Sequence, residues 1–317
     1  NYQKKFQKKQ MLNSFGKWLA KFQQLGGVFI MADLEIKKNV IKELKNKGHE
    51  VIYIEDKNLK FDYCLLSQNK YLIYIKKKIR KIFKIEEKYW YNIIQNEKIL
   101  NQEYDLLFCI QGVSFAPILL EHLRKYNKDI KSSLYLWDSI KYYNFLKNVS
   151  FFDKVYSFDL EDSIRYKNIN FLPFYWYPTE YHNNIYDISM IGSEHDNRLA
   201  IVERLKKQLE INKLSYFIKI YIPIKNSKLT NFKLWFYQLI GYSKKIRKIK
   251  LNLGLEKSEF IIHTPISSYE VNQIMQKSQC ILDTDKPTQT GTTPRLIWAL
   301  ALGKKIITTN NYIKKMP

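Results

Sequence analysis

The sequence predicts an α/β protein built from two Rossmann-like, doubly wound domains that face a cleft. Three observations predict this class. Short apolar runs typical of buried strands alternate with helical patterns in each half of the chain. The two series are joined by the segment 173–178, which contains two prolines and has no clear period. The length of 317 residues suits two domains of ordinary size.

In the first half, a basic amphipathic lead-in over residues 1–25 precedes a domain predicted over 26–175. A strand, a helix ended by Gly48 and a second strand fall within about 30 residues, which indicates a βαβ unit and a parallel sheet. The predicted strands cover residues 28–31, 50–54, 104–110, 132–137, 154–158 and 170–173. The predicted helices cover residues 34–47, the stretch from Gly112 to about Lys125, and an aromatic stretch before residue 154.

The second half repeats the alternation and is predicted as a domain over 176–317. Its predicted strands cover residues 187–192, 216–222, 260–263, 280–283 and 305–309, and its predicted helices cover 196–213, 269–277 and 292–302. Ligands of such sheets bind beyond the carboxyl ends of the strands, where these turns should converge. Because the sequence ends just after the last predicted strand, we expect the natural chain to extend further.

The formal net charge of +23 arises from 53 Lys and Arg against 30 Asp and Glu. Only seven of these basic residues are Arg, whereas proteins that read base sequence use Arg for many base contacts. The bias towards Lys, Ile, Asn and Tyr is typical of AT-rich coding DNA. We therefore predict no nucleic-acid partner.

Three distant cysteines in apolar surroundings, Cys64, Cys109 and Cys280, predict buried thiols rather than a zinc site or a disulfide framework. Free thiols are typical of a reducing cytoplasm. No apolar run approaches the roughly 18 residues of a membrane span, and the basic N-terminus lacks the features of a secretory signal. These features predict a cytoplasmic protein.

The most informative segment covers residues 287–310. A polar loop containing Gly291 leads into a helix whose first turn holds Thr292, Thr293, Pro294 and Arg295. Free N–H groups, the positive end of the helix dipole and the planar fork of Arg295 together form an anion site. The sequence therefore predicts a phosphate site here. The alternatives are helix capping by the threonines, a turn role for Gly291 and a salt bridge for Arg295.

Other binding candidates lie in the same half. They are Gly192, Ser193 and Arg198 after the first strand, His263 and Thr264 after the third, and Gln289 in the loop. Gly192-Ser193 and Arg198 predict a second anion contact at a strand-to-helix turn. A turn glycine, a structural histidine and a solvated glutamine are the alternatives.

Five stretches carry a resemblance through their order and spacing. They are Tyr135-Leu-Trp-Asp-Ser139, 152–159 with Asp162, Phe171-Leu-Pro173, 187–193 and 287–310. The chain resembles the GT-B-fold glycosyltransferases of bacterial surface polysaccharide synthesis, particularly the CgeB-like and lipopolysaccharide-core transferases. This resemblance implies that the C-terminal domain binds a nucleotide-activated sugar and the N-terminal domain binds a glycan or lipid-linked acceptor.

One departure from this family concerns two glutamates that many GT-B enzymes carry near the closing helix. The corresponding positions here hold Thr290 and Trp298. The nucleotide and the stereochemical outcome therefore stay open. Asp283-Thr-Asp285 is similar to the metal motif of the other major glycosyltransferase fold, but a strand end with a capping acid is the favoured interpretation, and no metal or other cofactor is predicted.

A base that deprotonates the acceptor hydroxyl is expected in the N-terminal half. The candidates are Asp138, Asp159, Asp162 and His122, and Asp138 is favoured because it ends a predicted strand.

Two basic aromatic segments, 70–88 and 224–257, suit an anionic membrane surface, the alternative being solvated lysines over core aromatics. The predicted function is a glycosyltransferase of surface-glycan synthesis, at work in the cytoplasm or at the inner face of the membrane. The first alternative is a non-catalytic nucleotide- or glycan-binding protein, and the second is a nucleic-acid-binding protein, which only the charge supports.

Overall fold

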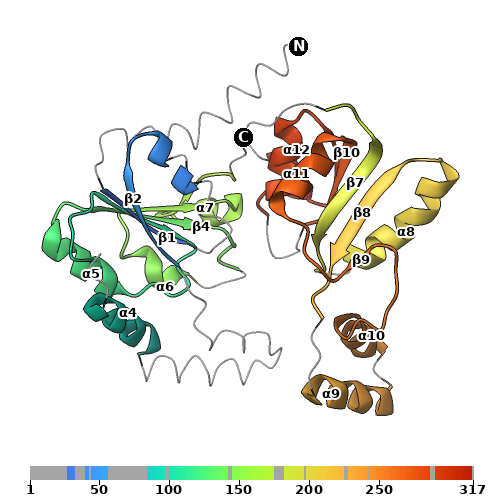
Figure 1. The fold of residues 1–317 in the computed structure, drawn as a ribbon, viewed down its shortest axis with the longest axis horizontal. Coiled ribbons are helices and arrows are strands. Elements are labelled where there is room, and N and C mark those ends of the chain that lie inside the picture. The colour runs from blue at the N-terminus through green and yellow to red at the C-terminus, as the bar shows by residue number, and fades with distance from the viewer. Residues whose placement is uncertain are drawn as a thin grey trace. The chain divides into compact units, whose positions relative to one another are not determined.

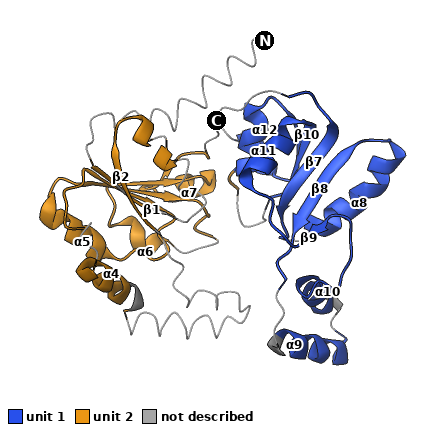
Figure 2. Cartoon of the chain, in the orientation of Figure 1, with its two compact units in different colours: residues 1–8, 175–287, 292–315 blue, residues 9–174, 288–291, 316–317 orange. Residues whose placement is uncertain are grey.

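The computed structural model describes residues 27–32, 40–42, 44–55, 84–96, 100–141, 145–174, 182–195, 198–224, 228–241, 243–285 and 290–315. The chain divides into two compact units (Figure 1, Figure 2). Unit 2 takes its described residues from 27–174 and 290–291, and unit 1 from 182–285 and 292–315. The predicted lead-in over 1–25, Gln289 and most of the basic segment 70–88 lie outside the described residues.

Unit 2 is built on a six-stranded sheet in the order β2-β1-β3-β4-β5-β6, in which each neighbouring pair is parallel. The strands are β1 (Gly27–Ala32), β2 (Glu50–Glu55), β3 (Leu106–Ile110), β4 (Lys131–Leu136), β5 (Lys154–Ser157) and β6 (Asn170–Phe171). The helices are α4 (Ile85–Asn96), α5 (Pro117–Tyr126), α6 (Leu146–Val149) and α7 (Leu160–Arg165).

The burial of strand β3 shows that both faces of this sheet are covered. All five of its residues are buried, as expected for a parallel strand. Leu107 and Cys109 pack in a core with Trp90 of α4 and Leu120 of α5, while the residues between them point to the opposite face. The indole Nε1 of Trp90 donates to the carbonyl oxygen of Ser114 at 2.7 Å, which satisfies the polar atom of this buried ring.

Unit 1 contains a five-stranded parallel sheet in the order β11-β10-β7-β8-β9. The strands are β7 (Tyr186–Ser193), β8 (Tyr216–Tyr221), β9 (Ile261–Ile262), β10 (Ser278–Asp283) and β11 (Lys305–Thr308). The helices are α8 (Arg198–Ile211), α9 (Lys228–Leu239), α10 (Ser243–Asn252), α11 (Ser268–Gln276), α12 (Pro294–Ala301) and the 3₁₀ helix η3 (Asn311–Lys315). The chain starts at the central strand β7, moves outward through β8 and β9, and then crosses to β10 and β11.

Helices cover both faces of this sheet (Figure 1). Leu199 and Val202 of α8 pack with Met190 and Leu282, whereas Met275 of α11 and Ala299 of α12 pack with Ile281. Leu282 and Ile281 are neighbours on β10 and so point to opposite faces. Unit 1 is therefore doubly wound, and the predicted α/β class with two parallel sheets is confirmed.

Some elements differ in extent from the prediction. The predicted strand over 260–263 is reduced to Ile261–Ile262, and the basic insertion after β8 folds into the two helices α9 and α10. None of the helices in the described part of the chain combines the length and the apolarity that a bilayer crossing requires.

Candidate functional site

The candidate site lies where the strand order of unit 1 reverses. β7 and β10 are parallel neighbours, and their connections leave the sheet in opposite directions. A crevice forms beyond the carboxyl ends of two such strands, and it is the usual ligand position in doubly wound sheets. Here β7 ends at Gly192 and Ser193, and β10 ends at Asp283. Three of the predicted binding residues, Gly192, Ser193 and Arg198, lie at this point or next to it.

Two guanidinium groups lie against the backbone of Gly192. A Cβ atom at this position would come within 2.7 Å of Nη2 of Arg295 and 2.8 Å of Nη1 of Arg198. A Cβ atom does not tolerate such distances, so both arginine side chains would have to move if Gly192 carried a side chain. The glycine thus allows two cations to approach the end of β7, which the sequence suggested only as a turn or an anion contact.

Arg198 links the ends of the two strands. Its Nε donates to Oγ1 of Thr284 at 2.6 Å, its Nη2 donates to the carbonyl oxygen of Thr284 at 3.0 Å, and its Nη1 donates to the carbonyl oxygen of Ser193. The residue is buried, with 6% of its surface exposed. Because all three nitrogens bind the protein, Arg198 fixes the shape of the crevice and adds positive charge beneath it.

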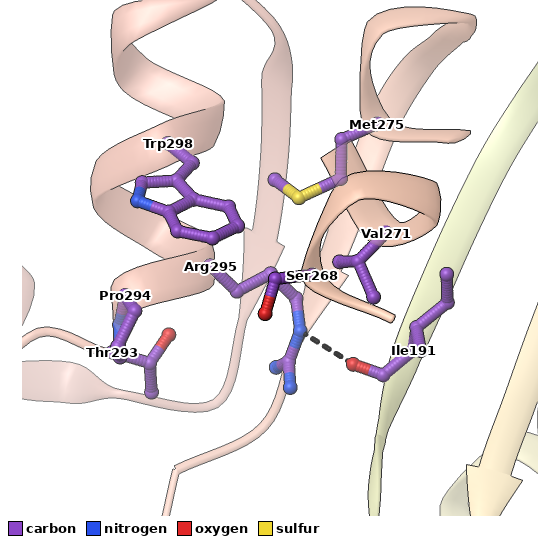
Figure 3. Close-up of a pocket in the computed structure, with 8 residues that line it drawn as sticks. All are labelled: Ile191, Ser268, Val271, Met275, Thr293, Pro294, Arg295 and Trp298. Atoms are coloured by element: carbon purple, nitrogen blue, oxygen red, sulfur yellow. Dashed lines mark hydrogen bonds between the residues drawn. The ribbon is translucent and has the colours of Figure 1, made fainter. Parts of the chain in front are cut away.

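Arg295 enters the same cluster from the first turn of α12. Its Nε donates to the carbonyl oxygen of Ile191 at 2.9 Å (Figure 3), and its Nη1 lies 2.5 Å from Oδ1 of Asp283. Asp283 is fully buried, whereas 15% of the Arg295 side chain is exposed. The salt-bridge alternative therefore describes Nη1, while Nε is held by a backbone carbonyl and Nη2 is the nitrogen that lies over Gly192.

The hydroxyl groups of the first turn are used differently. Thr293 caps α12, since its Oγ1 accepts from the N–H of Leu296 at 3.2 Å and donates to Oδ1 of Asp283 at 2.8 Å. Thr292 is 3% exposed, and its Oγ1 has no hydrogen-bond partner among the described residues. Buried hydroxyls are nearly always paired. The unpaired hydroxyl of Thr292 directly precedes the cap residue of α12.

A cavity of about 200 Å³ adjoins this cluster (Figure 3). It is lined by Ile191, Ser268, Val271, Met275, Thr293, Pro294, Arg295 and Trp298. Trp298 and Met275 point toward one another across it, so its walls are largely aromatic and aliphatic, with Arg295, Ser268 and Thr293 as polar residues (Figure 3). Such a combination suits a ligand with one flat, weakly polar part and one charged part.

The charges of the cluster nearly balance. Arg198 and Arg295 are opposed by Asp283 and by Glu194, whose Oε2 accepts from the N–H of Leu199 at 2.8 Å. Burial raises the pKa of the Glu194 carboxyl, and the hydrogen bond to Leu199 and the positive charge of Arg198 act in the opposite direction. Protonation of Glu194 therefore makes the site more attractive to an anion.

Thr290 and Gly291 belong to unit 2 rather than to this cluster. The N–H of Thr290 donates to Oδ2 of Asp159 at 2.8 Å, and its hydroxyl donates to Oδ1. A Cβ on Gly291 would lie 2.5 Å from a ring carbon of Phe158. The close approach that Gly291 permits is therefore to this ring, and Thr290, which replaces a family glutamate, binds the cap of α7.

His263 and Thr264 follow β9, two strands away from β7. Strands in a sheet are about 4.8 Å apart, which separates these positions from the β7 end by roughly 10 Å. Nδ1 of His263 lies 2.8 Å from the carbonyl oxygen of Ile222. His263 lines a second cavity of about 380 Å³ together with Gly254, Glu256, Lys257, Ser258, Glu259 and Ile261. The structure therefore does not bring His263 into the Arg295 cavity.

In unit 2, Asp138 lies just beyond the carboxyl end of β4 and is half-buried. Gln111, just beyond β3, holds it through a hydrogen bond from Nε2 to Oδ2 of 2.8 Å, while Oε1 of Gln111 accepts from the N–H of Trp137 at 2.8 Å. Gln111 has a φ of 71°, which is uncommon for a residue with a side chain. Sequence reasoning missed Gln111; its place between a strand and Gly112 was the available signal.

The other candidate bases have structural partners. Asp159 caps α7 by accepting from the N–H of Glu161 at 3.0 Å. Asp162 is buried, which raises its pKa, and it accepts from the hydroxyl of Ser157 at 2.8 Å. Nε2 of His122 lies 3.1 Å from Oδ1 of Asn101, which precedes β3 and lies toward the amino ends of the strands. Asp138 is therefore the candidate placed best for an acceptor at the carboxyl edge.

The described residues contain no group of three or more His, Cys, Asp and Glu side chains that could hold a metal ion. In the Asp283-Thr-Asp285 motif, Asp283 pairs with Arg295, and Asp285 accepts from the hydroxyl of Thr309. These partners agree with the interpretation of the motif as a strand end.

No protein-family model matches this chain, and no curated protein matches it. Two solved structures are similar over most of its length. The apo form of the lipopolysaccharide outer core galactosyltransferase WaaB has 15% sequence identity and a TM-score of 0.40, covering 89% of this chain and 80% of its own. MurG of Acinetobacter baumannii has 11% identity and a TM-score of 0.41, covering 90% of this chain and 87% of its own. At such values the function has to be inferred from the residues of this chain.

Proposed function

We propose that this protein is a glycosyltransferase that moves a sugar from a nucleotide-activated donor to a surface-glycan acceptor such as lipopolysaccharide or capsule. The observation that carries the proposal is the cluster at the β7–β10 switch point. Two guanidinium groups over Gly192, the buried hydroxyl of Thr292 and the positive end of the α12 dipole suit a diphosphate. The adjoining cavity, with Trp298 and Met275 in its wall, suits the flat part of a nucleotide.

In this proposal the donor diphosphate is the leaving group, and negative charge grows on it as the bond to the sugar breaks. Nη2 of Arg295 and the dipole of α12 are fixed before the reaction, so they stabilise this charge without reorganisation. Ser193 and Thr293 would contact the donor, and we propose Gln289 as a further contact. We propose that these oriented donors act without a divalent metal.

The acceptor side requires a base, because a sugar hydroxyl loses its proton as it attacks. We propose that the carboxylate of Asp138 takes this proton, with Gln111 holding it in the required orientation. The acceptor would be a glycan or lipid-linked glycan, handled in the cytoplasm at the inner face of the membrane. His263, which lines the second cavity, and Thr264, which follows it in the chain, would lie outside the donor site in this proposal.

The test is a thermal-shift screen of the full chain against UDP, GDP, CMP and ADP sugars, followed by an assay for release of the free nucleotide. A ligand that binds only the folded state raises the melting temperature by mass action. We expect one nucleotide class to raise it and to be released in the presence of an acceptor glycan. A shift without release would favour a non-catalytic binding protein, and the absence of any shift would overturn the donor site.

A further inference from the structure

Helix α9 exposes a stripe of large apolar side chains. The stripe consists of Phe232, Trp235, Phe236, Leu239 and Ile240 just after the helix, which are 60%, 57%, 45%, 70% and 55% exposed, respectively. The spacing i, i+3, i+4, i+7 and i+8 is that of one face of an α-helix. In a globular protein this face normally points to the core, so its exposure along a whole helix indicates a surface that something else covers.

The stripe faces outward because the opposite side of α9 is already used. Leu234 and Tyr237 on that side are partly buried, and α9 packs against α10, which lies between α9 and the sheet of unit 1 (Figure 1). Helix α10 is attached to the unit in turn. Nη2 of Arg247 donates to Oε2 of Glu203 on α8 at 2.8 Å, and Leu251 packs against the core of the unit. The hairpin of α9 and α10 therefore presents the stripe as part of the folded unit.

The charge of the hairpin identifies its partner. No acidic residue occurs between Glu210 and Glu256. The segment 224–255 contains eight basic residues, namely Lys225, Lys228, Lys233, Lys244, Lys245, Arg247, Lys248 and Lys250. Exposed Lys233 flanks the stripe on α9, and exposed Lys248 lies on α10. A second copy of this chain would bring like charges together, whereas an anionic surface complements them.

We propose that the hairpin of α9 and α10 is an interfacial anchor for an anionic lipid bilayer. The aromatic and aliphatic stripe enters the boundary between headgroups and acyl chains, and the lysines remain among the anionic headgroups. Twelve helical residues extend for roughly 18 Å, so α9 would lie along the surface rather than cross it.

The position of the hairpin matters for the unit that carries it. It follows the carboxyl end of β8, and the backbone of Gly254, after α10, lies beside Ile224 and His263 at that edge of the sheet. Gly192, at the end of β7, belongs to the same edge, because the strands are parallel. The anchor would therefore hold the carboxyl edge of unit 1 close to the lipid surface. This inference goes beyond the proposed function and does not depend on it.

The test is co-sedimentation of the full chain with vesicles of phosphatidylcholine alone or with phosphatidylglycerol added. We expect binding at low salt only where phosphatidylglycerol is present. In the double variant Trp235→Gln/Leu239→Gln the partition coefficient should fall roughly tenfold to a hundredfold, since two apolar side chains no longer leave water. The matched control is Ile211→Gln/Ile307→Gln, which replaces side chains of the same unit that are 62% and 54% exposed. Its binding should stay within about twofold of the wild type, as expected for sites that do not enter the lipid.

A second measurement uses quenching by brominated lipids. We expect tryptophan emission of the wild type to be quenched, and Trp235→Phe to keep its binding but lose most of the quenching. Failure of the wild type to bind anionic vesicles at low salt would overturn the proposal, as would equal losses of binding in the double variant and in its control. Light scattering gives the remaining outcome: if the wild type is a dimer that the double variant disrupts, and neither binds vesicles, a second copy covers the stripe instead.

Discussion

Replacement of Arg295 by methionine tests whether this residue serves a ligand or only its buried partner. The substitution removes Nη1 from Oδ1 of Asp283, a carboxylate with no exposed surface. Loss of one member of a buried ion pair costs about 3–5 kcal/mol. The hydroxyls of Thr293 and Thr308 still donate to Asp283, and the pair is not fully buried, so we expect the low end, about 3 kcal/mol. In a unit of this size that lowers the melting temperature by roughly 6–12 °C.

The single variant alone cannot separate stability from function, because both should fall. The double variant Arg295→Met/Asp283→Asn can. An amide at position 283 still accepts from Thr293 and carries no charge, and the removal of both charges from a buried pair is often nearly neutral. We therefore expect the double variant to regain most of the lost stability, measured by urea denaturation of the full chain.

Activity should not recover with stability if Arg295 contacts the donor. We expect release of nucleotide from the sugar donor to stay about tenfold to a thousandfold below the wild type in both variants, the range for loss of one preorganised donor. If the double variant regained both stability and turnover, Arg295 would be a structural residue, and the assignment of the donor site would be refuted.

Three further predictions concern the surroundings of this residue and the acceptor side. Gly192→Ala should destabilise the protein by about 1–3 kcal/mol and weaken nucleotide binding in calorimetry, because its Cβ collides with both guanidinium groups; unchanged binding would contradict this role. Asp138→Asn should lower the turnover rate by about 10²–10⁴-fold with nucleotide affinity intact. Gln111→Leu should lower the turnover rate and also shift the pH dependence of the reaction. A fall in affinity alone would argue against Asp138 as a base. Burial raises the pKa of Glu194, so its protonated form is favoured in the fold and anion binding should weaken as pH rises through that pKa. Titration with pyrophosphate at several pH values should show this dependence in the wild type and not in Glu194→Gln. The charged groups that also face Glu194 are Arg198, Arg247 and Glu203.

The strand and helix pattern made the fold accessible from the sequence. Parallel sheets with both faces covered need strands that are apolar throughout, and β3 shows this pattern without ambiguity. Pro294 after Thr293 likewise marks the start of α12, since proline is favoured in the first turn and threonine is a common cap. Local patterns of this kind depend on residues close together in the chain.

Contacts between distant residues could not be predicted in the same way. The pairing of Asp283 with Arg295 joins the end of a strand to the first turn of the next helix. The sequence favoured a strand end with a capping acid at Asp283 over a metal site, but it gave no sign of this particular ion pair. Thr290 and Gly291 looked continuous with the phosphate loop, yet they bind Asp159 and Phe158, more than a hundred positions earlier. The periodicity of α9 is that of a core-facing helix, and only the exposure of Trp235 reveals the opposite orientation.

The buried pair of Arg295 and Asp283 is best understood as preorganisation. A lone arginine beside a crevice would sample many rotamers and lose that freedom on binding a phosphate. Here Nε is held by the carbonyl of Ile191 and Nη1 by Asp283, so the plane of the guanidinium is fixed and Nη2 points over Gly192 before any ligand arrives. The carboxylate cancels part of the charge, but a single oriented N–H at the end of a helix acts on a developing charge without that entropic loss. On this view Gly192 and Asp283 belong to the site as much as Arg295 does. The glycine leaves space for Nη2 of Arg295, and the aspartate holds the guanidinium so that this nitrogen is correctly oriented.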